Sequence, residues 1–174
     1  MILVMPNGVY FNQAAPGAAI NMFQPTMTNS RSQSTVEIEE SFPDIINYIE
    51  ANYRVRKDQY SRAVAGLSMG AMQTKSITMS VNDVFTKIGL FSGGTISAEE
   101  AANTPGFKET YDLVFVSFGG REVENPRGGV DPGETTAGLK ASGVNAHYYV
   151  SPETAHEWQT WRRSLYQFAQ LLFK

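Results

Sequence analysis

One serine, placed between glycines, has the clearest chemical potential in this sequence. Residues 66–70 read G-L-S-M-G, after the apolar run 63–65 and before a helix-like segment, 69–80. At a sharp turn from strand to helix, the glycines let the backbone bend without a Cβ clash, and the serine hydroxyl is exposed. The start of the helix directs N–H groups toward a negative oxygen. The pattern predicts Ser68 as a nucleophile and the Met69 N–H as an oxyanion donor.

A nucleophilic serine needs a base, and the chain has two histidines. His156 lies between the last predicted strand, 147–150, and the terminal helix. Because the carboxyl ends of parallel strands meet at one edge of a sheet, Ser68 and His156 are expected at the same edge. His147 begins that strand at its other end and is the alternative. A purely structural role, such as capping the final helix, is the competing interpretation of His156.

The acid that orients the base should follow another strand and precede the histidine in the chain. Glu122 follows the apolar run 113–116 after a short glycine-containing turn, and it is the predicted acid. Glu124, two residues later, is the alternative. Asp112 lies at the wrong end of the same strand, and Asp131 lies deep in a loop rich in glycine and proline. The competing interpretation of either glutamate is a solvated carboxylate in a loop.

Tryptophans close to His156 suggest a substrate-binding surface. Trp158 is two residues past His156 and is predicted to border the cleft, where its ring would stack on a flat acyl group or a sugar. Trp161 lies on the apolar stripe of the terminal helix and is predicted to be mainly core. The Met69 side chain is expected to line the pocket, although methionine equally often fills a core. No metal cluster, phosphate-binding loop or nucleotide fingerprint occurs, so no cofactor or metal is expected.

The bulk composition is typical of a single globular domain over residues 1–174. Hydrophobic residues make up 42% of the chain and charged residues 18%. The net charge of −3 gives no electrostatic reason to expect nucleic acid or an anionic membrane as partner. The absence of cysteine excludes disulfides, thiolate catalysis and cysteine-bound metals. The apolar stretches are too short to span a bilayer.

Strand-like and helix-like segments alternate, which predicts an α/β sandwich with a mainly parallel sheet. Strands are expected at residues 2–5, 63–66, 88–91, 113–116 and 147–150. Helices are expected at 69–80, at 99–103 after a Ser97 cap, at 135–142, and at the terminus, striped by Trp158, Trp161, Leu165, Phe168 and Leu172. A further helix is expected to begin at Ser34 or Ser41, with Pro43 in its first turn and with Ile45, Ile46, Ile49 and Tyr53 buried. Segment 6–34 has no period and is expected to be a long loop that shapes the cleft.

With these segments placed, the chain resembles the putative-esterase branch of the α/β-hydrolases, near the carbohydrate esterase family 1 enzymes that include feruloyl esterases. The similar stretches follow one another over nearly the whole chain, at residues 4–8, 49–55, 65–71, 91–93 and 156–162. The resemblance implies a triad of Ser68, His156 and Glu122, with glutamate where many relatives have aspartate. It implies hydrolysis of hydroxycinnamoyl or acetyl esters on plant polysaccharides, and a secreted or periplasmic location that the residues themselves do not fix.

The chain departs from this family near its beginning. Relatives carry further strands and a helix before the counterpart of residues 2–5, and one loop there supplies a second oxyanion donor. One of those strands normally lies between the counterparts of 2–5 and 63–66. The resemblance therefore predicts an N-terminally truncated sheet and the loss of a donor, which lowers turnover on the order of a hundred- to a thousandfold. The chain is expected to be a C-terminal portion of a longer enzyme, or a short version that rearranges or pairs with a second copy; of these, pairing as a homo-oligomer is favoured.

Three functions are consistent with these residues. The first is a serine carboxylesterase that acts on feruloyl or acetyl esters of hemicellulose. The second is a thioesterase or acyltransferase of the same fold. The third is a catalytically weak carbohydrate-binding remnant that retains the triad but lacks half of its oxyanion hole.

Overall fold

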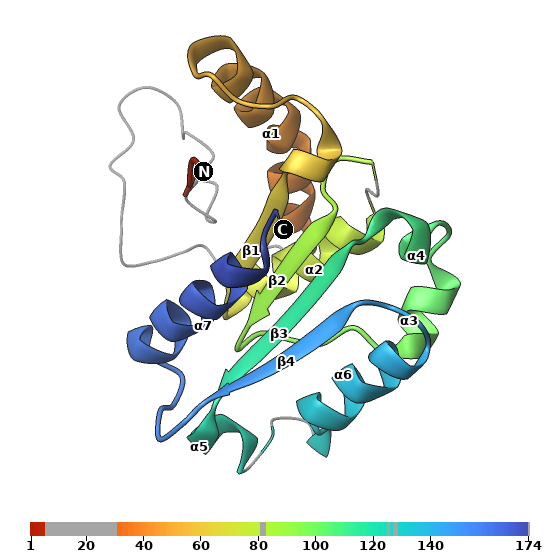
Figure 1. Ribbon diagram of the computed structural model, residues 1–174, viewed down its shortest axis with the longest axis vertical. Helices are drawn as coiled ribbons and strands as arrows, with labels where there is room; N and C mark the ends of the chain where they lie inside the picture. Colours follow the sequence, from red (N-terminus) through yellow and green to blue (C-terminus); the bar gives the residue numbers. More distant parts are fainter. Residues whose placement is uncertain (6–30, 81–82, 125, 127–128, 174) are drawn as a thin grey trace. The chain divides into compact units, whose positions relative to one another are not determined.

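The computed structural model describes residues 1–5, 31–80, 83–124, 126 and 129–173, which Figure 1 shows in colour. Contacts group the chain into two compact units, Met1–Val55 and Arg56–Lys174. Each unit is considered by itself, and the single domain expected over the whole chain stays a prediction. Most of the predicted loop at 6–34, with its proposed part in shaping the cleft, lies outside the described residues.

The first unit contains one long helix, α1 (Arg31–Asn52). Both predicted starts were wrong, because α1 begins before Ser34 and continues through Pro43, which lies inside it. A proline inside a helix removes one backbone donor and costs about 3 kcal/mol, so the position of Pro43 was misleading as a boundary signal. Tyr53, expected on the buried face, lies past the end of the helix and is 50% exposed.

The predicted strand at residues 2–5 is not formed. The large side chains of this segment are between 41% and 82% exposed. An apolar run becomes a strand only where neighbouring backbones satisfy its N–H and C=O groups. No described residue forms such a ladder with this segment.

The second unit is built on a four-stranded sheet in which all neighbouring strands are parallel. Its strands, in spatial order, are β1 (Ala63–Leu67), β2 (Lys87–Phe91), β3 (Leu113–Gly119) and β4 (Ala146–Ser151). The corresponding four predicted strands are therefore confirmed. Within the described part of the chain, β1 forms an edge of the sheet, and Ala65 at its centre is exposed.

Helices connect these strands, as the alternating pattern predicted. They are α2 (Met69–Ser80), α3 (Ala98–Asn103), α4 (Phe107–Thr110), α5 (Gly120–Val123), α6 (Pro132–Ala141) and α7 (Trp158–Leu171), with a 3₁₀ turn at Gln59–Ser61. The predicted capping of α3 by Ser97 is confirmed, since its hydroxyl accepts from the Glu100 N–H at 3.1 Å. The helix α6 begins earlier than predicted because Asp131 caps it and Pro132 occupies its first position. The short helices α4 and α5 were not predicted.

Helices cover both faces of this sheet, which confirms the three-layer α/β architecture (Figure 1). Successive strand side chains point to opposite faces. On one face, α2, α3, α4 and α6 pack against Ile88, Leu90, Val114 and Val116. On the other face, Phe168 of α7 packs against Phe91, Leu113 and Phe115. The sheet is thus held between two apolar layers, and its carboxyl-end turns project beyond them.

Candidate active site

Ser68 occupies the turn between β1 and α2, in a left-handed backbone conformation with φ of 53°. Such a φ is uncommon for a residue other than glycine. Backbone hydrogen bonds hold it, because the Ser68 N–H donates to the Phe91 carbonyl at 2.8 Å and the Ser68 carbonyl accepts from the Ala71 N–H at 3.1 Å. A Cβ at Gly66 would lie 2.1 Å from the carbonyl oxygen of Gly70. The turn therefore requires glycine at position 66, as the sequence pattern indicated.

His156 lies in the loop between β4 and α7, and its ring joins two other predicted site residues. Its Nε2 is 2.7 Å from the Ser68 Oγ, and its Nδ1 is 2.7 Å from the Glu122 Oε1. These residues are 88 and 34 positions from His156 in the chain. The His156 side chain is 32% exposed and that of Glu122 only 15%. The structure therefore brings a hydroxyl, an imidazole and a carboxylate into one row that solvent reaches.

Glu122 belongs to α5, which begins directly at the carboxyl end of β3. Its Oε2 accepts two hydrogen bonds, from the Gly119 N–H at 2.7 Å and from the Ser92 Oγ at 2.7 Å. Both carboxylate oxygens are thus engaged, with Oε1 directed to the imidazole. The alternative, Glu124, is exposed at the end of α5 and is not part of the row. Asp112 lies at the opposite end of β3.

The loop that carries His156 is fixed by close packing and hydrogen bonds. The Thr154 carbonyl accepts from the Arg121 N–H at 2.9 Å, and a Cβ at Gly119 would lie 2.5 Å from the same carbonyl oxygen. The buried Thr160 hydroxyl donates to the Thr154 hydroxyl at 2.6 Å. These contacts join the loop to α5 before it and to α7 after it. They hold the imidazole beside Glu122 without any bond from the substrate.

Met69 is the first residue of α2 and follows Ser68 directly. The N–H groups in the first turn of a helix have no acceptor within that helix. The Met69 N–H is therefore suited to receive a negative oxygen formed next to the Ser68 hydroxyl, and its role as oxyanion donor stays a prediction. The Met69 side chain is 48% exposed, which excludes the core-filling alternative.

Three aromatic rings form a row that begins at the imidazole. The His156 and Trp161 rings meet edge to face with centroids 5.2 Å apart, and the Trp161 and Trp158 rings do the same at 5.2 Å. Trp161 also packs against the core of the α7 face, as expected. Trp158 is 75% exposed and does not belong to the buried stripe. Its ring is the solvent-facing end of the row.

Sequence analysis did not assign a role to Ser92. This residue follows β2 as Ser68 follows β1, has the same φ of 53°, and is 6% exposed. A serine before two glycines, at the end of a strand next to that of Ser68, was the available signal. Two glycines after a strand are typical of an ordinary turn, so no role was assigned to the serine before them.

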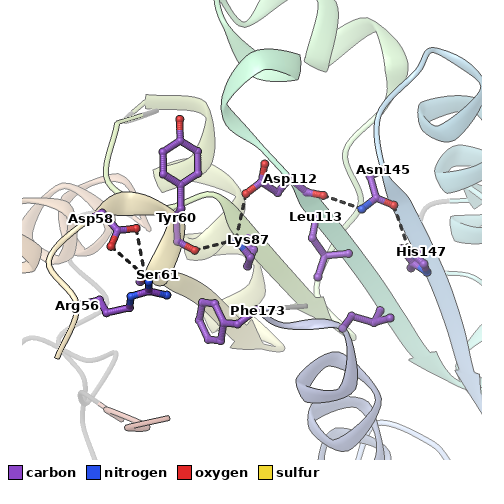
Figure 2. Close-up of a pocket in the computed structure, with 11 residues that line it drawn as sticks. Arg56, Asp58, Tyr60, Ser61, Lys87, Asp112, Leu113, Asn145, His147 and Phe173 are labelled. Carbon is purple, nitrogen blue, oxygen red and sulfur yellow. Dashed lines mark hydrogen bonds and ion pairs between the residues drawn. The ribbon is translucent and has the colours of Figure 1, made fainter.

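A separate pocket of about 820 Å³ lies at the amino ends of the strands, at the opposite end of the sheet from Ser68 (Figure 2). It is lined by Arg56, Asp58, Tyr60, Ser61, Lys87, Asp112, Leu113, Asn145, His147, Leu171 and Phe173. Within it, the Lys87 Nζ lies 3.0 Å from the Asp112 Oδ2, and the His147 Nε2 lies 3.1 Å from the Asn145 Oδ1. The second histidine thus pairs with an amide, at the opposite end of the sheet from Ser68.

In the described part of the chain, no group of three or more histidine, aspartate or glutamate side chains is arranged to hold a metal ion. No helix within those residues has the length and apolar character needed to cross a membrane.

Comparison by sequence finds a curated relative that matches most of this chain. The chain is 42% identical over 131 residues to an endo-1,4-beta-xylanase/feruloyl esterase of Xylanibacter ruminicola. The match covers 75% of this chain and 17% of that protein. The chain therefore spans about a sixth of the length of this curated relative. No family model matches the chain.

Comparison by structure finds esterases with the same fold. A ferulic acid esterase of Anaeromyces mucronatus, solved with ferulic acid, aligns with a TM-score of 0.64 and 20% identity, covering 91% of this chain and 61% of that one. The feruloyl esterase module of Clostridium thermocellum, solved as a mutant with sinapinate, aligns with a TM-score of 0.61 and 18% identity, covering 80% and 59%. These comparisons confirm the predicted resemblance to feruloyl esterases and the α/β-hydrolase fold.

Proposed function

We propose that this protein is a serine carboxylesterase that hydrolyses feruloyl or acetyl esters of plant polysaccharides. The observation that carries the proposal is the continuous row from the Ser68 Oγ through His156 to Glu122, with 2.7 Å at each step. Nucleophile, base and orienting carboxylate in this order are what acyl transfer by a serine requires. The similarity to a feruloyl esterase supports the same reaction.

In the first half of the proposed reaction, the Ser68 Oγ attacks the ester carbonyl carbon while His156 Nε2 accepts its proton. Glu122 holds the Nδ1–H of the ring and stabilises the imidazolium that forms. The negative oxygen of the tetrahedral intermediate binds at the Met69 N–H, at the positive end of α2. When the intermediate collapses, His156 returns the proton to the departing sugar oxygen, and the acyl group stays on Ser68.

The second half repeats these steps with water. His156 removes a proton from a water molecule as its oxygen attacks the acyl carbon, and Met69 again binds the oxyanion. Collapse breaks the bond to the Ser68 Oγ, which regains its proton from His156. The products are a carboxylic acid and the restored hydroxyl, so the proposed reaction uses water and no cofactor.

A hydroxycinnamoyl group suits the aromatic end of the site. The exposed Trp158 ring is joined through Trp161 to the catalytic imidazole, so a planar acyl group on Ser68 has an aromatic surface within the same row. Offset or edge-to-face contacts between aromatic rings contribute about 0.5–1.5 kcal/mol beyond their area burial. The two esterases with this fold were solved with ferulic acid and with sinapinate, which supports the same class of acyl group.

The proposed partner is thus a polysaccharide ester or a small ester of the same acid. No nucleic acid, membrane, metal or cofactor is part of the proposal. The homo-oligomer expected from the sequence stays a prediction, and size-exclusion chromatography with light scattering checks it.

The proposal is tested by the release of ferulate from methyl ferulate by wild type and Ser68→Ala. The substitution removes the nucleophile, so we expect kcat/KM to fall by about 10⁴- to 10⁶-fold. Ser97→Ala is the matched control, because Ser97 caps α3 and lies outside the row. Equal rates for wild type and Ser68→Ala would refute the proposal. Acetyl esters, acyl thioesters and acceptor sugars in the same assay separate it from the thioesterase and acyltransferase alternatives.

A further inference from the structure

We propose that Ser92 is a positioning residue of this site, which holds the Glu122 carboxylate in the orientation that His156 needs. The inference rests on the proposed function and adds to the triad a residue that does not touch the substrate.

The two oxygens of the Glu122 carboxylate have different hydrogen-bond partners. The Ser92 hydroxyl and the Gly119 N–H both donate to Oε2 of Glu122, each at 2.7 Å, which leaves Oε1 for the His156 Nδ1–H at 2.7 Å. Hydrogen bonds to an ionised group are short and roughly twice as strong as neutral ones. A glutamate has one more rotatable bond than an aspartate, and these two donors fix the additional torsion.

The backbone conformation of Ser92 is unusual for a serine. Its φ of 53° lies in the left-handed region, which glycine adopts freely and serine does not. The next two residues are glycines, so a third glycine would suit the turn better on conformational grounds. Serine is nevertheless present, 6% exposed, with its N–H donating to the Ser117 carbonyl at 2.8 Å. The feature that a glycine would not provide is the hydroxyl bonded to Glu122.

The turn that carries Ser92 also contacts the nucleophile, Ser68. The Phe91 carbonyl accepts from the Ser68 N–H at 2.8 Å. A Cβ at Gly93 would lie 2.0 Å from the Ser68 carbonyl oxygen, so the two backbones are in direct contact. The turn at 91–93 therefore touches Ser68 on one side and Glu122 on the other. It sets the separation that the imidazole bridges.

A double-mutant cycle tests whether Ser92 acts through Glu122. We would measure kcat and KM on methyl ferulate for wild type, Ser92→Ala, Glu122→Ala and the double variant. For Ser92→Ala we expect kcat to fall about 10- to 100-fold, the effect of one hydrogen bond to a charged group, with KM within about twofold. In the Glu122→Ala background, removal of the Ser92 hydroxyl should change kcat by less than about twofold.

Ser92→Gly separates this role from a contribution to folding. Glycine removes the hydroxyl but suits the left-handed backbone, so we expect the same fall in kcat as for alanine with a melting temperature at or above that of the alanine variant. Ser97→Ala should do the reverse, lowering the melting temperature through the lost cap while kcat is retained. This pair keeps the test decisive if Ser92→Ala does not fold.

Two results would overturn the inference. One is a kcat for Ser92→Gly within twofold of wild type, measured in an assay in which Ser68→Ala is inactive. This result would refute the role of Ser92 and leave the proposed esterase activity standing. The other is an equal loss from Ser92 substitution with and without Glu122, which would mean that the hydroxyl does not act through the carboxylate. Full activity of Ser68→Ala would instead end the proposed function, and the inference with it.

Discussion

The two ends of the parallel sheet hold the chain's two histidines in opposite kinds of surroundings. At the carboxyl ends of the strands, His156 contacts a hydroxyl and a carboxylate. At the amino ends, His147 contacts the amide of Asn145 in the pocket of Figure 2. Both residues carry the same imidazole group. The partners that the fold supplies decide which histidine can act as a base, because a carboxylate stabilises the imidazolium that forms more strongly than a neutral amide does.

Three turns at the carboxyl ends of the strands share an uncommon backbone conformation. Ser68, Ser92 and Glu153 follow the carboxyl ends of three strands and have φ values of 53°, 53° and 60°. Residues held in such sparsely populated conformations cluster at functional sites. The turns at the carboxyl ends thus carry serine or glutamate at positions where the backbone conformation favours glycine.

The largest predicted effect separates the two histidines directly. His156→Ala should lower kcat/KM on methyl ferulate by about 10⁴- to 10⁶-fold, because the base is lost. His147→Ala removes an imidazole of similar size from the other end of the sheet, and kcat/KM should stay within about twofold of wild type. A loss of more than tenfold in His147→Ala would break the comparison.

The carboxylates provide the next contrast. Glu122→Gln should lower kcat by about 10²- to 10⁴-fold, since the amide does not stabilise the imidazolium. Asp112→Asn changes the carboxylate at the other end of β3, where its partner is the largely buried Lys87. We expect unchanged kcat and a loss of about 1 kcal/mol in the free energy of unfolding. Urea titration of wild type and Asp112→Asn measures the loss in the free energy of unfolding. A fall in kcat for Asp112→Asn would contradict the assignment of Glu122, and not Asp112, as the carboxylate that orients His156.

A third prediction concerns two glycines at the carboxyl end alone. A Cβ at Gly93 would lie 2.0 Å from the Ser68 carbonyl oxygen, whereas one at Gly70 would have no atom within 4 Å. Gly93→Ala should displace the nucleophile and reduce kcat about 10- to 100-fold. Gly70→Ala, in α2, should leave kcat unchanged and raise the free energy of unfolding by about 0.5 kcal/mol. Equal kcat values for the two variants would show that the turn at 91–93 does not position Ser68.

The smallest predicted effect is on stability at alkaline pH. Burial, with a contribution from Asp83, raises the pKa of Tyr111 to about 12; this tyrosine precedes the amino end of β3, and its hydroxyl donates to the Thr78 carbonyl at 2.8 Å. An unfolded tyrosine ionises at about pH 10, so between about pH 10 and 12 the unfolded chain loses a proton that the folded chain keeps. The free energy of unfolding should be undiminished below pH 10 and fall over that window.

Urea midpoints at pH 9 and 11 measure this decline. Tyr111→Phe loses the bond to Thr78 and should be less stable at pH 9, yet its midpoint should fall less on going to pH 11. The decline should not vanish, because burial, with contributions from Asp131 and Glu122, also raises the pKa of Tyr148 to about 12. An identical decline in wild type and Tyr111→Phe would contradict the role of Tyr111.

Local patterns predicted the four strands and the residues at their carboxyl ends. Each strand is a short apolar run with a turn signal after it, and parallel strands bring such turns to one edge; this is why Ser68, Glu122 and His156 could be placed together from their order alone. The turn after β2 contained the same information about Ser92. The role of its hydroxyl was missed because the position of a serine in a turn does not show that it donates to a carboxylate 30 positions away.

The errors in predicting the fold have a common cause. Residues 2–5 are apolar enough for a strand, but pairing decides strand formation, and the partner backbone is not encoded in the run itself. Pro43 was taken as a boundary because local rules place it in a first turn, whereas α1 continues through it. Trp158 was placed both beside the cleft and on the apolar stripe of the terminal helix, and it is exposed, since a helical stripe does not show at which position burial begins.

Covalent labelling tests the central claim most directly. A fluorophosphonate reacts with a serine only where a base activates it and an oxyanion site receives the new charge. We expect one adduct per folded chain, and peptide mass spectrometry should locate it on Ser68. The adduct should form in His147→Ala and be absent in His156→Ala. A folded wild-type protein that stays unlabelled, or one labelled equally well without His156, would contradict it.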